Sequence, residues 1–250
     1  MIAANAPPSV DPDEVARFEA IGEDWWSPAG SMRALHQINP LRLGWLRDLM
    51  IAHFTLSPGG DRPGPLAGLA ILDVGCGAGL LSEPLARLGA NVTGIDPAAG
   101  SLEMARRHAE ETGASLAYRA ASVEALAAEG ASFDVVLAME VVEHVRDVKS
   151  FVKTACGLVR PGGLFAASTL NRTLRSFALA IIGAEYVLGW VPRGTHRWEQ
   201  FVTPEELRAA CRAAGCREKT RVGLVYDPLR ARWRLSRDTG VNYMMAAKRT

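Results

Sequence analysis

A glycine-rich turn between a strand and a helix constrains the fold of this chain more than any other feature. Segment 69–80 is an apolar run, then Asp73, then three glycines alternating with other small residues, and a helix-like segment at 80–88 follows. Glycines let backbone approach a ligand where a side chain would collide. A second short apolar segment ends in Asp96, the place where nucleotide-binding α/β folds hold ribose hydroxyls. The alternative is a turn that only packs a helix on a sheet.

Strand-like and helix-like segments alternate from residue 69 onward. The expected strands are 69–73, 90–96, 116–118, 133–139, 163–169, 222–226 and 241–247. The expected helices are 12–21, 41–54 after a helix stop at Pro40, 101–112, 148–159 and 204–214. This alternation predicts a Rossmann-like α/β fold, a mostly parallel seven-stranded sheet with helices on both faces. Ligands of such sheets bind beyond the carboxyl ends of the strands.

Composition limits the class of protein. The chain has 250 residues, 48% of them hydrophobic, and a net charge of +1, which suits a globular protein and argues against a nucleic-acid binder. Its four cysteines form no C-x-x-C pair, so we expect no zinc site or disulfide framework and a cytoplasmic location. We predict a disordered segment at 1–12 and one domain over 13–250, with N-terminal helices at 13–56 and an apolar insert at 172–197.

The spacing of the glycines also indicates which nucleotide-containing cofactor the turn would bind. The dinucleotide fingerprint needs a third glycine after two intervening residues, and Leu80 stands there. The pattern instead resembles the first motif of class I S-adenosylmethionine-dependent methyltransferases, an acid followed by G-x-G-x-G. Asp73, Gly75 and Gly77 would then lie beside that cofactor, whose cationic sulfonium and amino group suit an electronegative strand end. A nicotinamide-dependent oxidoreductase is the alternative from another enzyme class.

Further motifs resemble the ubiquinone-biosynthesis O-methyltransferases. They are Phe-Glu-Ala at 18–20, Trp-Trp at 25–26, Leu-His-Gln-Ile-Asn-Pro-Leu-Arg at 35–42, Met-Glu-Val-Val-Glu-His-Val at 139–145, Ser-Thr-Leu-Asn-Arg at 168–172, Gly-Ala-Glu-Tyr at 183–186, Pro-Arg-Gly-Thr-His at 192–196 and Val-Asn-Tyr-Met at 241–244. The resemblance implies an antiparallel last strand. It also implies methyl transfer from S-adenosylmethionine to catechol-type hydroxyls of polyprenylated phenols, in both O-methylation steps of ubiquinone synthesis.

The resemblance carries over to four cofactor-binding residues. Arg42 matches an arginine that contacts the cofactor, where its guanidinium would suit the carboxylate. Gly75 matches the glycine at the methionine part, Asp96 the ribose-binding acid, and Met139 a residue packed beside the cofactor. Without the motifs, Arg42 would be a solvated helix charge and Met139 a core residue. The adenine contact stays open, because the acid many methyltransferases place after the third strand is replaced here by the segment 121–124.

Glu140, Glu143 and His144 are the candidates for chemistry. A phenol hydroxyl has a pKa of about 10, so a base or a metal must help its ionisation at neutral pH. If a helix begins near Glu140, the three side chains share one face and could bind a divalent cation, Mg²⁺ for example. The alternatives are His144 as a direct base oriented by Glu143, or a helix N-terminus whose acids only stabilise the helix dipole.

The apolar insert adds a membrane hypothesis. It is too short for a secure transmembrane helix, but its aromatic residues and flanking arginines suit an interfacial segment. We therefore expect contact with a membrane surface through 172–197, a peripheral position on the inner face, and a ubiquinone-biosynthesis complex as a further partner. The alternative is a cap buried over the active site. His196, within the insert, is a second candidate base.

A methyltransferase for a soluble small molecule and a non-catalytic binding module are the remaining alternatives. The apolar insert argues against the former. The cluster of Glu140, Glu143 and His144 argues against the latter, which would not need it.

Overall fold

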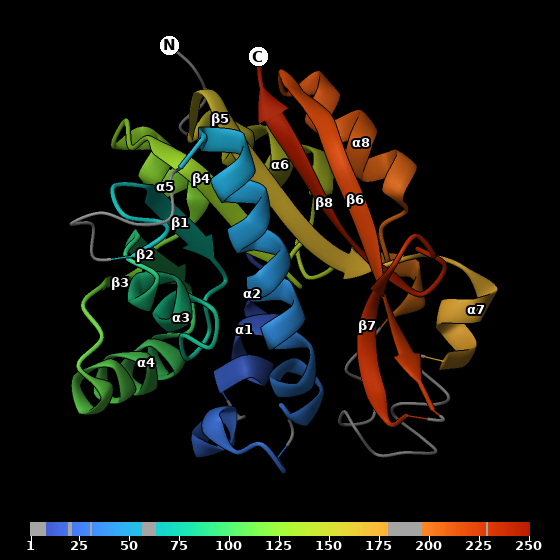
Figure 1. Ribbon diagram of the computed structural model, residues 1–250, viewed down its shortest axis with the longest axis horizontal. Coiled ribbons are helices and arrows are strands. Elements are labelled where there is room, and N and C mark those ends of the chain that lie inside the picture. The colour runs from blue at the N-terminus through green and yellow to red at the C-terminus, as the bar shows by residue number, and fades with distance from the viewer. Residues whose placement is uncertain (1–8, 20–21, 31, 57–63, 180–196, 229) are drawn as a thin grey trace.

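An eight-stranded sheet in the order β3-β2-β1-β4-β5-β8-β6-β7 forms the centre of the computed structural model (Figure 1). The structure describes residues 9–19, 22–30, 32–56, 64–179, 197–228 and 230–250. The strands are β1 Ala70–Val74, β2 Asn91–Asp96, β3 Ala117–Ala120, β4 Phe133–Met139, β5 Val159–Leu170, β6 Cys216–Asp227, β7 Arg232–Ser236 and β8 Asn242–Arg249. The first five are parallel, and β8 runs antiparallel to β5, as predicted.

The predicted number of strands is wrong by one. The segment Arg-Trp-Arg-Leu-Ser, now β7, pairs antiparallel with residues Gly223 to Asp227 of β6. Its alternation of charged and apolar side chains is the period of a strand with one solvated face. The hairpin extends the sheet beyond the seven predicted strands and stands beside a long helix, α2 (Figure 1).

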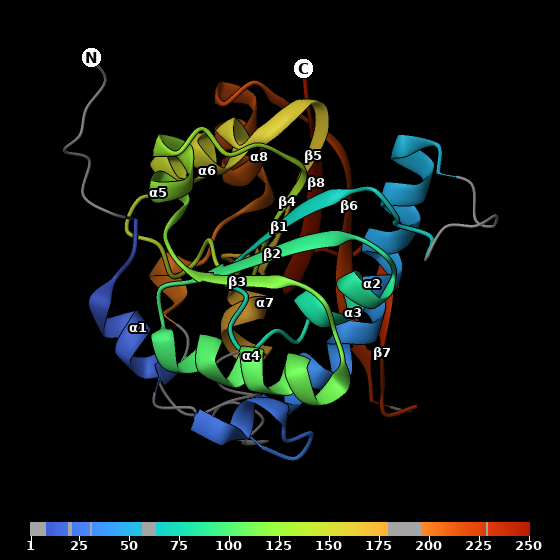
Figure 2. The same ribbon diagram turned by 90° about the vertical axis from the view of Figure 1, so that its left-hand side faces the viewer.

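Helices cover both faces of the sheet (Figure 2). On one face α2 (Arg33–Phe54) and α3 (Ser82–Arg87) share an apolar core with the strands. On the other, α5 (Val123–Ala128), α6 (Val148–Gly157) and α8 (Pro204–Ala213) do the same. The helix α4 (Ala99–Thr112) packs against β2 and β3, and the short elements are α1 (Pro12–Glu19), η1 (Gly22–Trp26), α7 (Leu174–Ser176) and η3 (Trp198–Gln200).

The helix stop predicted at Pro40 is wrong, because α2 runs through this residue. Proline removes one backbone hydrogen bond inside a helix. Packing compensates: Ile38, Arg42, Leu46 and Met50, spaced four residues apart, form a buried stripe along α2. Because the helix continues past Pro40, Arg42 lies on its buried face, where it lines the cavity described below.

The structure describes only the last residues of the segment 1–12, for which disorder is predicted. Ser9 is buried, Val10 forms an antiparallel bridge with Val145, and α1 begins at Pro12. Residues 1–8 lie outside the described part of the chain. Within the ranges that the structure describes, no helix is both long and apolar enough to cross a membrane.

Candidate active site

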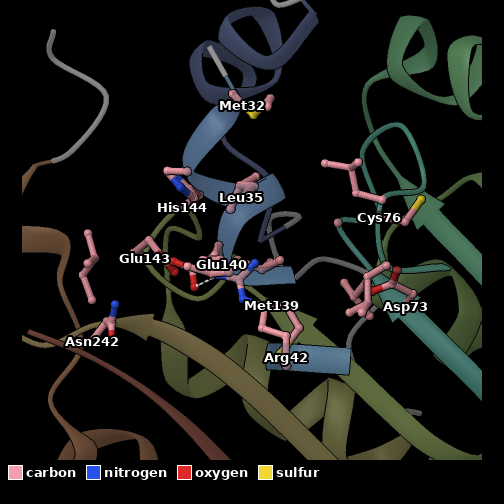
Figure 3. Close-up of a pocket in the computed structure, with 18 of the residues that line it drawn as sticks. Met32, Leu35, Arg42, Asp73, Cys76, Met139, Glu140, Glu143, His144 and Asn242 are labelled. Atoms are coloured by element: carbon pink, nitrogen blue, oxygen red, sulfur yellow. Dashed lines mark hydrogen bonds and ion pairs between the residues drawn. The ribbon is translucent and has the colours of Figure 1, made fainter. Parts of the chain in front are cut away.

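A cavity of about 840 Å³ lies beyond the carboxyl ends of β1 and β4. The chain order reverses between these two neighbouring strands, and such a reversal is where open α/β sheets bind ligands. All the predicted site residues of the described chain except Gly77 line it: Arg42, Asp73, Gly75, Asp96, Met139, Glu140, Glu143 and His144. In Figure 3, His144, Glu143 and Glu140 lie on one side and Asp73 and Cys76 on the other.

The glycine turn has a backbone that only glycine adopts easily. Gly75 and Gly77 have φ values of 65° and 52°, in the left-handed region. A Cβ atom at Gly75 would stand 2.6 Å from Val141 Cγ2, and one at Gly77 would stand 2.5 Å from Trp25 Cη2. Gly77 therefore lies beneath Trp25, and Trp25 itself lines the cavity. Trp25, the first residue of the aromatic pair, thus contributes a wall of the site.

Asp96 joins the end of β2 to the glycine turn. Its Oδ2 accepts a hydrogen bond from the Gly77 N–H at 2.9 Å, and its Oδ1 accepts one from the Ala98 N–H at 2.8 Å. Burial raises its pKa, and these two hydrogen bonds oppose the rise. A carboxylate has about four lone-pair sites, so Asp96 retains acceptor capacity for ribose hydroxyls.

Asp73, at the end of β1, favours a cationic ligand. Burial raises its pKa to about 7, and the charge of Asp96 adds to the rise, while a hydrogen bond from Ser82 Oγ at 2.5 Å and the charge of Arg42 oppose it. A cation in the cavity would stabilise the ionised form. This is the electrostatic environment predicted for the sulfonium and amino group of S-adenosylmethionine.

Arg42 offers the complementary charge. It is only 4% exposed, forms an ion pair with Glu140, and has a buried Nε atom without a hydrogen-bond partner in the described structure. A buried guanidinium N–H without a partner is costly, and a ligand carboxylate would satisfy it. Together with Asp73 and Asp96, Arg42 gives the cavity the residues that fit S-adenosylmethionine.

No helix begins near Glu140, because residues 140–147 form turns and α6 begins only at Val148, with Asp147 as its N-cap. Glu140 has a φ of 56°, and its N–H lies 3.0 Å from the Ser168 carbonyl oxygen and 3.1 Å from Ser168 Oγ. The same hydroxyl donates to Glu140 Oε1 at 2.9 Å. A non-glycine residue held in this conformation directly after a strand is a feature of functional sites.

As a result, the predicted metal ligands do not share a helix face. The Glu140 carboxylate faces Arg42 and Ser168, and His144 faces Glu14. Among the residues described, no three histidine, cysteine, aspartate or glutamate side chains are grouped so as to hold a metal ion. This arrangement does not fit the Mg²⁺ hypothesis, so we derive no step through a metal.

His144 instead forms a pair with Glu14 that the sequence pattern did not reveal. Its Nδ1 lies 2.8 Å from Glu14 Oε2, and both side chains line the cavity. Glu14 comes from α1, which the bridge between Val10 and Val145 ties to the loop that carries His144. Burial lowers the pKa of His144, but the hydrogen bond to Glu14 and the charge of Glu143 outweigh it, and the net pKa is raised.

Glu143 stands beside His144 and is 4% exposed. Burial raises its pKa to about 8, and the charge of Glu140 adds to the rise. Its Oε2 has no hydrogen-bond partner within the described part of the structure. The raised pKa favours the protonated carboxyl, which can donate a hydrogen bond to an oxygen in the cavity.

The predicted adenine region also borders the cavity. Ala121, Ser122 and Val123 line the cavity after β3, and Ser122 Oγ is also the N-cap of α5. Met139 is buried at the end of β4. His196 and residues 180–196 of the predicted insert lie outside the described ranges.

Comparison with known proteins identifies the family. A family model described as a methyltransferase domain matches residues 72–167. The ubiquinone biosynthesis O-methyltransferase of Methylobacterium nodulans is 60% identical over 242 residues, which cover 97% of this chain and 96% of that protein. That of Methylocella silvestris is 61% identical over 246 residues, with the same coverage.

Solved structures agree on the fold. The magnesium protoporphyrin IX methyltransferase of Synechocystis PCC 6803, with bound S-adenosylhomocysteine, has a TM-score of 0.62 at 20% identity, over 95% of this chain and 94% of that chain. The N-methyltransferase NodS of Bradyrhizobium japonicum has a TM-score of 0.61 at 16% identity, over 95% and 97%. These likenesses confirm the class I methyltransferase fold. With relatives this similar over almost its whole length, the chain belongs to the ubiquinone biosynthesis O-methyltransferase family, as its motifs predicted.

Proposed function

We propose that this protein transfers a methyl group from S-adenosylmethionine to a catechol-type hydroxyl of a polyprenylated phenol, including demethylubiquinol, in the O-methylation steps of ubiquinone synthesis. The observation that carries this proposal is the pair of Glu14 and His144, which faces the same cavity as the glycine turn. The names of the close relatives supply the substrate class.

The cofactor is held by three charged residues in this proposal. Arg42 binds its carboxylate through the guanidinium, whose Nε lacks a protein partner in the described structure. Asp96 accepts hydrogen bonds from the ribose hydroxyls, and Asp73 stabilises the positive charge of the amino group and sulfonium. Gly75 has no side chain, so the backbone of the glycine turn can approach the methionine part of the cofactor.

His144 is the general base in this mechanism. Because Nδ1 donates a hydrogen bond to Glu14, the neutral imidazole has its lone pair on Nε2, and the acceptor hydroxyl transfers its proton there. Glu14 stabilises the imidazolium that forms. Protonated Glu143 donates a hydrogen bond to the second catechol oxygen, which orients the ring. The proton passes from His144 to solvent after the reaction.

S-adenosylmethionine, held by Arg42, Asp73 and Asp96, would supply an electrophilic methyl group to the phenolate oxygen, and the electron pair of the broken carbon–sulfur bond would stay on sulfur. The task of the protein is alignment, because the opposite charges of phenolate and sulfonium cancel in the transition state. Arg42 and Asp96, on α2 and β2, fix one partner, and His144 with Glu143 fixes the other.

The test is methyl transfer by the full-length protein, with a catechol carrying a polyprenyl tail as the acceptor. We expect a singly methylated ether, detected by mass spectrometry, with and without exhaustive chelation of metals. A control acceptor whose two hydroxyls are already methylated should give no product. Loss of activity on chelation, restored by Mg²⁺, would favour a metal at Glu140, Glu143 and His144 over a direct base. No transfer to any catechol would overturn the proposed function.

We also propose that the segment 172–197 contacts a membrane surface, because a polyprenyl substrate resides in the bilayer. In the described part of this segment, Leu174 is 83% exposed and Phe177 and Leu179 are also exposed, beside Arg172 and Arg175. Exposed apolar side chains flanked by arginines suit an anionic lipid interface.

Deletion of residues 176–189, or the paired substitutions Leu174→Glu and Leu179→Glu, should abolish binding to anionic liposomes in a sedimentation assay. The added charges oppose burial of these side chains in the interface. The control is Ala127→Glu, a charge added at an exposed position of α5. Binding that survives both changes would refute membrane contact through this segment.

A further inference from the structure

We propose that the junction between α2 and the β6–β7 hairpin is a second binding subsite, which takes the isoprenoid tail of the acceptor. This inference rests on the proposed function, because it assigns a place to the tail of that acceptor. It adds a site that begins in the cavity already described and leads away from the reacting atoms.

The cavity has an apolar part that the cofactor does not account for. The glycine turn, Asp73 and Asp96 form its polar part. Its lining also includes Ile38 of α2 and Leu224, Tyr226 and Trp233 of the hairpin. Such a lining recognises a ligand through buried apolar area rather than hydrogen bonds. The part of the acceptor with that chemistry is its hydrocarbon tail.

A second hollow, of about 550 Å³, lies between the same two elements. Its apolar lining includes Leu41, Trp45 and Leu49 of α2 and Leu235 of β7. Charged side chains, Asp48 and Lys219, also line it. Leu235 is 37% exposed, so this hollow presents apolar surface to water. A hydrocarbon chain lying there would cover that surface.

The same pair of elements, α2 and the hairpin, contributes to the lining of both hollows. Trp233 and Leu235 are two residues apart in a strand, so they project from the same face of β7. Trp233 lines the first hollow and Leu235 the second. Along α2, the lining passes from Leu35 to Leu49, an axial rise of about 21 Å. A flexible linear chain leaving the cavity can follow this path.

Trp233 lines the first hollow and lies two residues before Leu235, which lines the second. Its Nε1 donates a hydrogen bond to Gln37 Oε1 on α2 at 3.2 Å, and its ring centroid lies 5.4 Å from that of Tyr226. These contacts hold the indole against α2 at the apolar part of the cavity. The position gives Trp233 control over how the tail passes from the catechol pocket into the outer hollow.

The experiment compares acceptors that share one catechol ring and differ in the number of isoprene units, from none upward. For the wild-type protein, kcat/KM should rise with each added unit until the outer hollow is filled. Leu235→Glu should remove the gain from the later units and lower the ratio of kcat/KM for long-tailed to tail-free acceptor by about tenfold or more. Leu235→Met should preserve the ratio.

Two further variants serve as a second test and as a control. Leu49→Gln changes the opposite wall, on α2, and should lower the same ratio. Arg234→Glu places a charge on the opposite face of β7 and should leave the ratio unchanged. An unchanged ratio in Leu235→Glu and Leu49→Gln, or equal losses with both acceptors, would overturn the tail subsite. A wild-type protein that methylates neither acceptor would instead refute the proposed function.

Discussion

Replacement of His144 by glutamine should lower kcat for methyl transfer by about 100- to 10,000-fold, the usual contribution of a positioned general base. Glutamine is close to histidine in size and polar, but it cannot accept a proton at neutral pH. Binding of S-adenosylhomocysteine should stay unchanged, because the cofactor contacts assigned to Arg42, Asp73 and Asp96 remain. Rates come from initial-velocity assays with a saturating catechol acceptor, and binding comes from calorimetry.

Glu14→Gln is the companion variant, and its effect is on the pH profile. The free base must be neutral to accept a proton, so kcat/KM rises with pH through the pKa of His144. The hydrogen bond and charge of Glu14 raise that pKa above its ordinary value of 6.5. Without that charge the pKa falls, and the acid limb of the profile should move to lower pH. The loss of rate should be smaller than in His144→Gln.

Glu124→Gln is the matched control for this shift. The Glu124 carboxylate accepts a hydrogen bond from the Ser9 N–H at 3.3 Å, so it touches the same N-terminal segment. An equal shift of the acid limb in this variant would mean that the segment's position, rather than the charge of Glu14, controls His144. For the first variant, full methyl-transfer activity in His144→Gln would show that His144 is not the general base.

Asp96→Ala should weaken the binding of S-adenosylhomocysteine by at least about a hundredfold, since hydrogen bonds to a charged group are each worth about 1.5–3 kcal/mol. The change removes the acceptor for two ribose hydroxyls. It also leaves the Gly77 and Ala98 N–H groups without their carboxylate, so the glycine turn loses its anchor. Calorimetric titration of both proteins, with NADH as a second ligand, measures the effect.

The matched control is Asp134→Ala. Asp134 also accepts a hydrogen bond from a backbone N–H, that of Ala70 at 2.8 Å, but it stands at the amino end of β4, away from the cavity. It should therefore leave cofactor affinity unchanged while removing a comparable contact. Equal binding by wild type and Asp96→Ala would remove Asp96 from the cofactor site. Binding of NADH in place of S-adenosylhomocysteine would reopen the oxidoreductase alternative.

Local sequence was sufficient to predict the glycine turn and the strand ends, because there the backbone conformation itself decides which residue types fit. Gly75 and Gly77 adopt conformations that other residues reach only with strain, Asp96 ends β2, and Asp73 is the last residue but one of the parallel strand β1. Parallel strands bring their carboxyl ends to one edge of the sheet, so acids at those ends are predictably close together. For this reason the cavity and its position could be predicted without knowing any side-chain contact.

Prediction from local sequence failed where the spacing of residues was compatible with two different local structures. The interval between Glu140, Glu143 and His144 fits a helix face, but it also fits a loop, and the loop forms. A hydrogen bond from the Ser168 hydroxyl to Glu140, from the neighbouring strand, stabilises that choice. Pro40 predicts a helix stop, but the buried stripe of α2 outweighs the single hydrogen bond that proline removes.

The sequence by itself determined the fold class and the cofactor turn, because glycine conformations, strand ends and apolar periodicity are local properties, and its motifs resembled those of the family. Only the tertiary structure decided which side chains act together. Glu14 meets His144 across 130 residues of chain, Ser168 meets Glu140 across 28, and Trp233 meets Gln37 across 196. No local pattern encodes such pairs, because they form only when packing brings distant elements to a common cavity.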